Sequence, residues 1–216
     1  MRSVKSPRCP YVFTAAFGRE LIEYLSGESV DEYETAGYCW EEFAEHYSEL
    51  CEAAEDYFAQ ATTGEPAWAA VCMVRYCGSS REWAEGVIER TQTGNPANAA
   101  VDMVRYHGSA REWAEKVIEQ AQTGNPPSAA VDMVRYCNSA REWAEGVIEH
   151  AQTGNPAFWA YYMARHLGSP REWAEGVIER AQTGNPTLWA VDMVQYCGSA
   201  REWADRVAAR MRQRCV

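Results

Sequence analysis

The sequence lacks the features that mark membrane proteins, secreted proteins and general nucleic-acid binders. No apolar run approaches the roughly 18 residues that a membrane span needs. Polar and proline residues follow the basic start, where a secretion signal needs an apolar segment. With 31 acidic and 20 basic side chains the net charge is −11, so we expect neither direct nucleic-acid binding nor membrane binding, which both need a basic face. Eight cysteines are too few for a disulfide scaffold, which favours a cytoplasmic location.

Catalytic motifs are missing as well. The chain has no recognisable Ser/His/Asp or Cys/His constellation, no glycine-rich phosphate loop and no HExxH. Its four histidines lie at scattered positions. We therefore expect a protein that is not an enzyme and that holds no cofactor.

What the sequence does have is a 30-residue repeat. The copies span 64–93, 94–123, 124–153, 154–183 and 184–213, and the third differs from the second at six of 30 positions. A unit of this length is too small to bury its own apolar face, so the copies must stack to form a core. We expect an all-α fold, an alpha-alpha solenoid of five helix–turn–helix repeats.

Each repeat contains the start and stop signals of two helices. In the second copy, Asn95-Pro96 predicts a helix start, and Gly108 predicts its end. The apolar residues between them include Tyr106, which we expect in the core with its neighbours. Ser109 to Glu112 has the form of a capping box and predicts the start of the second helix. Pro170 is expected at the first position of that helix in the fourth copy.

The second helix carries an apolar stripe with a repeated tryptophan, which we interpret as a core column. Its members are Trp83, Trp113, Trp143, Trp173 and Trp203. The glycines at 86, 146 and 176 share a position with Lys116 and Arg206, so that position is expected to face solvent. Arg111 and Glu115 recur at the same spacing and predict an exposed charge ladder.

The regions outside the repeats differ from them in charge. Residues 1–63 are interpreted as an acidic helical N-terminal cap, with a degenerate repeat at about 39–63. Residues 20–63 hold 13 acids and no lysine or arginine. The repeat region, 64–216, instead ends in a basic C-terminal tail, and its last eleven residues contain four arginines. The acidic cap has three interpretations: a solvated end, a docking surface for a basic partner that uses Glu41, Glu42 and Glu45, or head-to-tail self-association with the basic tail.

The Asn-Pro start, the alanine-rich first helix and the mid-unit glycine resemble short HEAT-like repeats. The resemblance covers 64–213, although the chain lacks the arginine that this family often has after the proline, and it adds a tryptophan in the second helix. HEAT-like proteins are mostly binding scaffolds, and a few are bilin lyases or alkylated-DNA glycosylases. No catalytic motif of either enzyme matches a position here.

One position shared by all five repeats could suggest a metal ladder. It is occupied by Cys77, His107, Cys137, Leu167 and Cys197. Neighbouring helices lie about 8–10 Å apart, too far for residues that must each approach one zinc ion to about 2.0–2.3 Å. We expect no metal site.

The positions that vary on the constant frame are the candidates for a binding surface. On the first helices they come in pairs four residues apart, which share one helix face. The candidates are Trp68, Asn98, Asp102, Ser128, Asp132, Phe158, Tyr162, Leu188 and Asp192, with Cys72 as the partner of Trp68. Selection for a partner and unconstrained drift both explain this variation. The fourth repeat differs most, and its Phe158 and Tyr162 are expected to be partly exposed, as interface residues are.

These observations favour a non-enzymatic protein-binding scaffold or adaptor. Two alternatives remain at this level. One is an acidic inhibitor, or nucleic-acid mimic, that occupies a basic site on a target protein. The other is an enzyme with a small-molecule site at the junction of cap and repeats.

Overall fold

Short helices joined by tight loops make up the whole described chain. The computed structural model describes residues 51–61 and 65–214. They divide into two units between Ala110 and Arg111, and each unit is described by itself. No strand occurs in either described part, and neighbouring helices pack in pairs, so the expected class, an all-α repeat solenoid, is confirmed.

The first unit contains the earliest repeat helices. Its elements are α3 (Cys51–Gln60), α4 (Pro66–Cys72), a π-helical turn η2 (Met73–Cys77), α5 (Arg81–Arg90) and α6 (Pro96–His107). Helix α3 lies within the segment interpreted as a degenerate repeat and packs against α4, η2 and α5.

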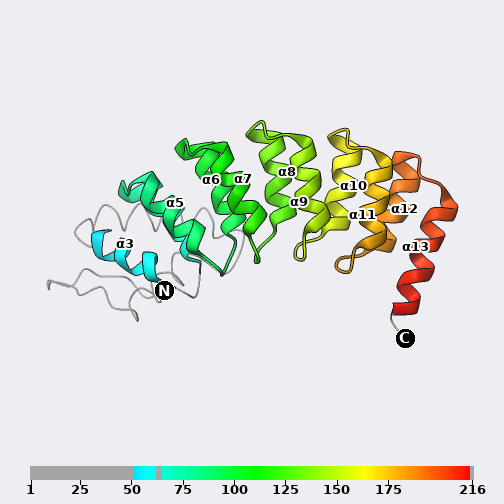
Figure 1. Cartoon of the computed structure of the whole chain (residues 1–216), viewed down its shortest axis with the longest axis horizontal. Coiled ribbons are helices and arrows are strands. Elements are labelled where there is room, and N and C mark those ends of the chain that lie inside the picture. Colours follow the sequence, from blue (N-terminus) through cyan, green and yellow to red (C-terminus); the bar gives the residue numbers. More distant parts are fainter. Residues whose placement is uncertain (1–50, 62–64, 215–216) are drawn as a thin grey trace, which may run out of the picture. The chain divides into compact units, whose positions relative to one another are not determined.

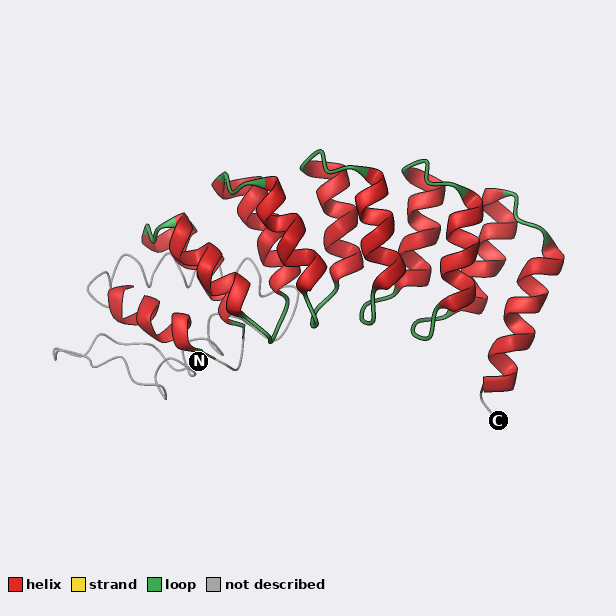
Figure 2. Ribbon diagram, viewed as in Figure 1, coloured by secondary structure: helices red, strands yellow, loops and turns green. Residues whose placement is uncertain are grey.

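The second unit contains seven helices in its described residues. They are α7 (Arg111–Gln120), α8 (Pro126–Tyr136), α9 (Arg141–His150), α10 (Pro156–His166), α11 (Arg171–Arg180), α12 (Pro186–Cys197) and α13 (Arg201–Arg214). In this unit, consecutive helices lie side by side and the loops between them alternate between two ends (Figures 1 and 2).

Asn-Pro starts the first helix of a repeat, as predicted. The side-chain oxygens of Asn95, Asn125, Asn155 and Asn185 each accept a hydrogen bond from the backbone N–H three residues on. The proline that follows lacks an N–H at a position where none is needed. This explains why the helix starts recur every 30 residues.

The predicted capping box is wrong. Helix α9 begins at Arg141, with Ala140 as its N-cap, and α11 has Pro170 as its N-cap rather than at its first position. The serine before each N-cap belongs to the end of the preceding helix, because Ser109 N–H donates to Met103 O six residues back, around the left-handed Gly108. In the third repeat Asn138 adopts the same left-handed conformation at φ 58°, as predicted.

Two columns of apolar side chains form the core. The methionines at 73, 103, 133, 163 and 193 have no exposed surface, and the isoleucines at 88, 118, 148 and 178 have almost none. Burial of each such side chain stabilises the fold by about 1.5–3 kcal/mol.

Three expectations about burial need correction. Tyr106 is 60% exposed, because it lies in the last turn of α6 and Arg105 rather than another helix covers its ring. Cys72 is buried rather than part of a surface stripe. The tryptophan column is half-buried at its first four positions, and Trp203 alone among them is buried.

An arginine ladder links successive repeats inside each unit. In the second unit, Arg141 Nη1 donates to Gly168 O at 2.7 Å, and Arg171 Nη1 donates to Gly198 O at 3.0 Å. Arg81 makes the same bond to Gly108 O in the first unit at 3.0 Å. Each arginine also forms the expected ion pair with the glutamate four residues on, at 3.4–3.6 Å. The charge ladder is therefore confirmed, and it also ties the start of one repeat's second helix to the end of the next repeat's first helix.

Candidate functional site

The first helices of the second unit present a continuous set of aromatic rings, which we call the aromatic surface. It comprises Tyr136 of α8, Phe158, Trp159, Tyr162 and His166 of α10, and Trp189 and Tyr196 of α12. Tyr136 is 47% exposed and Tyr196 is 50% exposed, whereas the phenylalanine and both tryptophans are half-buried.

The rings of α10 pack against one another. Phe158 lies 4.6 Å from Trp159 and 6.1 Å from Tyr162 between ring centroids, and Tyr162 lies 4.7 Å from His166. Residues 158, 162 and 166 are four apart, so one face of the helix carries all three. These contacts fix the orientations of the rings.

Helix α12 continues the cluster. Trp189 lies 4.8 Å from Phe158 and stacks on the buried Tyr161 at 5.6 Å. Tyr161 occupies a position held by valine in the four other repeats, and its larger ring is matched by the larger Trp189. Part of the fourth repeat's variation is therefore repacking of buried side chains.

Two arginines extend from one of these helices to an aromatic ring on the next. The Arg135 guanidinium lies 4.8 Å from the Tyr136 ring and 5.8 Å from the Tyr162 ring. Arg165 lies 4.0 Å from the Tyr196 ring and donates a hydrogen bond to the Tyr161 hydroxyl, which raises the pKa of this arginine. A guanidinium stacked on an aromatic face keeps its N–H edges available to a ligand.

The structure brings together some of the predicted residues and separates others. Phe158 and Tyr162 are half-buried, as predicted, and contact each other. Asp132 lies 3.9 Å from Arg135 at the edge of the same surface. Leu188 is 46% exposed on α12.

The other predicted residues are not part of this cluster. Ser128 and Asp192 are half-buried on α8 and α12. Trp68, Asn98 and Asp102 belong to the first unit, where Asn98 is exposed and the other two are half-buried. Glu41, Glu42 and Glu45 lie outside the described residues, so the acidic docking surface and the head-to-tail association stay predictions.

Sequence reasoning missed the arginines and the tyrosines at the ends of the first helices. The signal was present as the repeated pairs Arg75-Tyr76, Arg105-Tyr106 and Arg135-Tyr136. In each pair the guanidinium lies 4.8–5.0 Å from the neighbouring ring. The apolar periodicity of the helix assigned these tyrosines to the core instead.

Helix α12 exposes a valine at a position that is buried in the repeats before it. Val191 is 52% exposed, whereas the equivalent Val131 and Tyr161 are buried. Helix α13 carries exposed polar side chains, among them Arg206, Arg210 and Arg212.

Metal binding gains no support from the described part of the chain. No group of three or more His, Cys, Asp or Glu side chains there could hold a metal ion. Burial, and then the nearby Arg75, lower the pKa of His107, which occupies the position otherwise held by cysteine or leucine.

No family model, no curated protein and no solved structure matches this chain. The likeness to HEAT-like repeats therefore rests on the residues of the repeat and on its two-helix architecture. Among the described helices, none has the length and apolar character required to cross a membrane.

Proposed function

We propose that this chain is a non-enzymatic protein-binding scaffold that uses the aromatic surface of α8, α10 and α12. The observation that carries the proposal is the exposure of Tyr136 and Tyr196 beside ordered Phe158 and Tyr162, with Arg135 and Arg165 stacked on the rings. Tyrosine, tryptophan and arginine are the residues most enriched among those that dominate binding energy at protein interfaces.

The packing of the rings supports this role. Side chains that are already held by their neighbours lose little conformational entropy when a partner binds. Phe158 contacts Trp159, Tyr162 and Trp189, so its orientation is fixed by three rings.

The chemistry of the surface indicates the kind of partner that fits it. The partner presents an apolar or aromatic patch to the rings and hydrogen-bond acceptors, carbonyl or carboxylate oxygens, to the two arginines. A cytoplasmic location is part of the proposal, supported by the free thiols of Cys72 and Cys197.

The test is affinity capture with three forms of the full chain. The double variant Phe158→Ser/Tyr162→Asp reproduces the residues of the third repeat at these positions, Ser128 and Asp132, so the fold should persist. The control carries Glu202→Ser and Asp205→Ser on exposed positions of α13.

We expect one protein to be retained by the wild type and the control, and lost from the double variant. Its retention should survive high salt, because an apolar contact is not screened. Equal capture by all three forms would place the contact elsewhere.

A further inference from the structure

The second helices of the second unit line an open cavity that the aromatic surface does not include. It has a volume of about 500 Å³ and lies between α7 and α9. Its lining includes the apolar Ile118 and Val147 and the polar Glu119, Trp143 and His150. This is the size of a small-ligand site.

Two hydrogen bonds define the polar wall of the cavity. Trp143 Nε1 donates to Glu119 Oε1 at 2.8 Å. His150 Nδ1 lies 2.8 Å from Gly146 O, so its ring is turned toward its own helix. The partner of the Glu119 carboxylate is a neutral indole, and no described cation lies within ion-pair distance of it.

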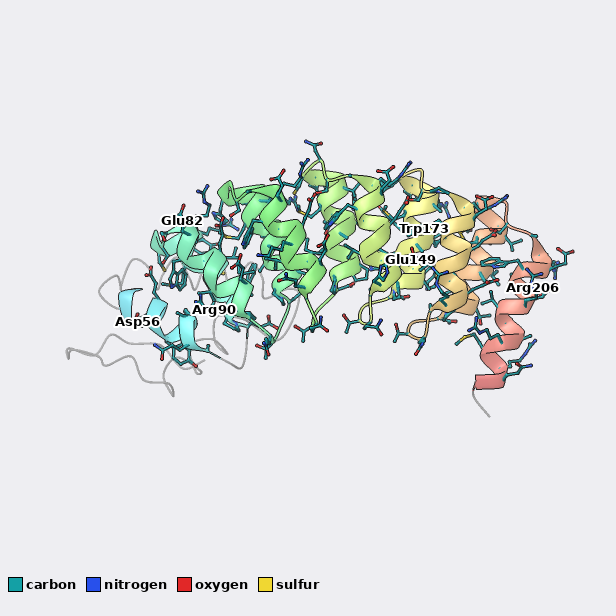
Figure 3. The ribbon with its side chains drawn as sticks, in the orientation of Figure 1. Asp56, Glu82, Arg90, Glu149, Trp173 and Arg206 are labelled. Atoms are coloured by element: carbon teal, nitrogen blue, oxygen red, sulfur yellow. The ribbon has the colours of Figure 1, made fainter. Side chains whose placement is uncertain are left out.

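At the equivalent junction one repeat later, between α9 and α11, an arginine of the chain itself binds the glutamate. There Arg180 replaces His150, and its Nη2 donates to Glu149 Oε1 at 2.5 Å. Trp173 Nε1, the equivalent of the Trp143 donor, has no hydrogen-bond partner among the described residues. Figure 3 labels Glu149 of α9 and Trp173 of α11.

The space beside the glycine four residues before each of these basic residues also differs between the two junctions. A Cβ added to Gly176 would lie 3.3 Å from Arg180 Nη1, so the arginine extends over the glycine toward the neighbouring repeat. Gly146 lines the cavity, and a Cβ added to it would meet nothing within 4 Å. The chain's own guanidinium thus spans the junction between α9 and α11, whereas no side chain of this kind spans the junction between α7 and α9 among the described residues.

We infer that the cavity between α7 and α9 binds a guanidinium group, with Glu119 as the carboxylate partner and the Trp143 indole beside it. The fork of a guanidinium suits a carboxylate, and its flat face stacks on an indole. Glu142, the other acid in the lining, already pairs with Arg141 at 2.9 Å, so Glu119 is the charge that recognises the ligand. His150 leaves room for the ligand that Arg180 excludes at the next junction.

The experiment follows the indole N–H resonance of Trp143 by NMR while N-acetyl-arginine methylamide is added to the full chain. We expect a saturable shift and binding about fivefold weaker for the lysine analogue, which lacks the planar fork. Glu119→Gln should weaken binding about tenfold or more, since hydrogen bonds to charged groups are about twice as strong as neutral ones.

Two further variants make the test specific. His150→Arg should abolish binding and leave the fold intact, because arginine occupies the same position in Arg90 and Arg180. Glu149→Gln, the same change one repeat later, should leave binding unchanged. A shift that does not saturate, equal binding of the lysine analogue, or equal losses in Glu119→Gln and Glu149→Gln would overturn the inference.

A second binding measurement distinguishes a polypeptide from a small molecule as the source of the guanidinium group. An arginine flanked by glycines in a pentapeptide should bind about tenfold more tightly than the single residue if the natural ligand is a polypeptide, because added contacts lower the dissociation constant. Equal affinities identify a small guanidinium compound as the ligand.

Discussion

Removal of one arginine from the inter-repeat ladder should weaken a defined local contact. Arg141 bonds the carbonyl of Gly168 at 2.7 Å and pairs with Glu145 at 3.4 Å. A hydrogen bond to a charged group is worth about 1.5–3 kcal/mol. The Arg141 side chain is 38% exposed, so solvent screening reduces the two contacts together to about 1 kcal/mol. Arg141→Ala should lower the local stability of the α10 end by that amount.

Arg201 supplies a matched control. It occupies the same position at the start of α13 and has the same helix propensity, but no described repeat follows it. Arg201→Ala therefore removes the same side chain without the bond to a neighbouring repeat.

The assay is amide hydrogen exchange at the N–H groups of Leu167 and Ser169, which both donate to Met163 O at the end of α10. A loss of about 1 kcal/mol accelerates exchange there about fivefold in Arg141→Ala. The reasoning is refuted if these two amides exchange at the wild-type rate in Arg141→Ala, or accelerate equally in Arg201→Ala.

Three further predictions follow from single sites. Ser169→Ala should leave the urea midpoint unchanged or raise it, because the buried Ser169 hydroxyl has no hydrogen-bond partner among the described residues. Asn155→Ala, in contrast, should lower the free energy of unfolding by about 1 kcal/mol, because the N-cap hydrogen bond is lost. Gly168→Ala should cost about 1–2 kcal/mol in the same assay, since the residue has φ 75° and the nearest atom, at 3.6 Å, is no obstacle. Burial raises the pKa of the Cys72 thiol, so less thiolate exists at a given pH. Maleimide should therefore label Cys72 far more slowly than the half-buried Cys137, as followed by peptide mass spectrometry, and equal rates would contradict this.

Local signals in the sequence were sufficient for the helices and for most of their core. Asn-Pro and the left-handed Gly or Asn depend on residues within one helix or turn, and the structure confirms both. The apolar spacing predicted the methionine and isoleucine columns, but it wrongly placed Tyr106 in the core. The capping box failed because Ser109 fits two motifs, and the end of α6 uses its N–H. The sequence motif alone does not decide between them.

The same reasoning could not predict the contacts between repeats. The bond from Arg141 to Gly168 spans 27 residues and depends on the stacking of helices. The contact of Phe158 with Trp189 and the open cavity beside His150 likewise result from differences between neighbouring repeats. Sequence periodicity identifies which positions vary, but packing determines which of them meet.

The central claim, that a protein partner binds the aromatic surface, is tested most directly by site-specific photocrosslinking. Benzoylphenylalanine replaces Phe158 in one sample and the exposed Glu202 of α13 in another, and both are irradiated in native lysate. We predict a single crosslinked partner from position 158, identical to the protein lost from the double variant, and none from position 202. A partner that the wild type captures but that crosslinks at neither position, or at position 202 alone, would contradict the account.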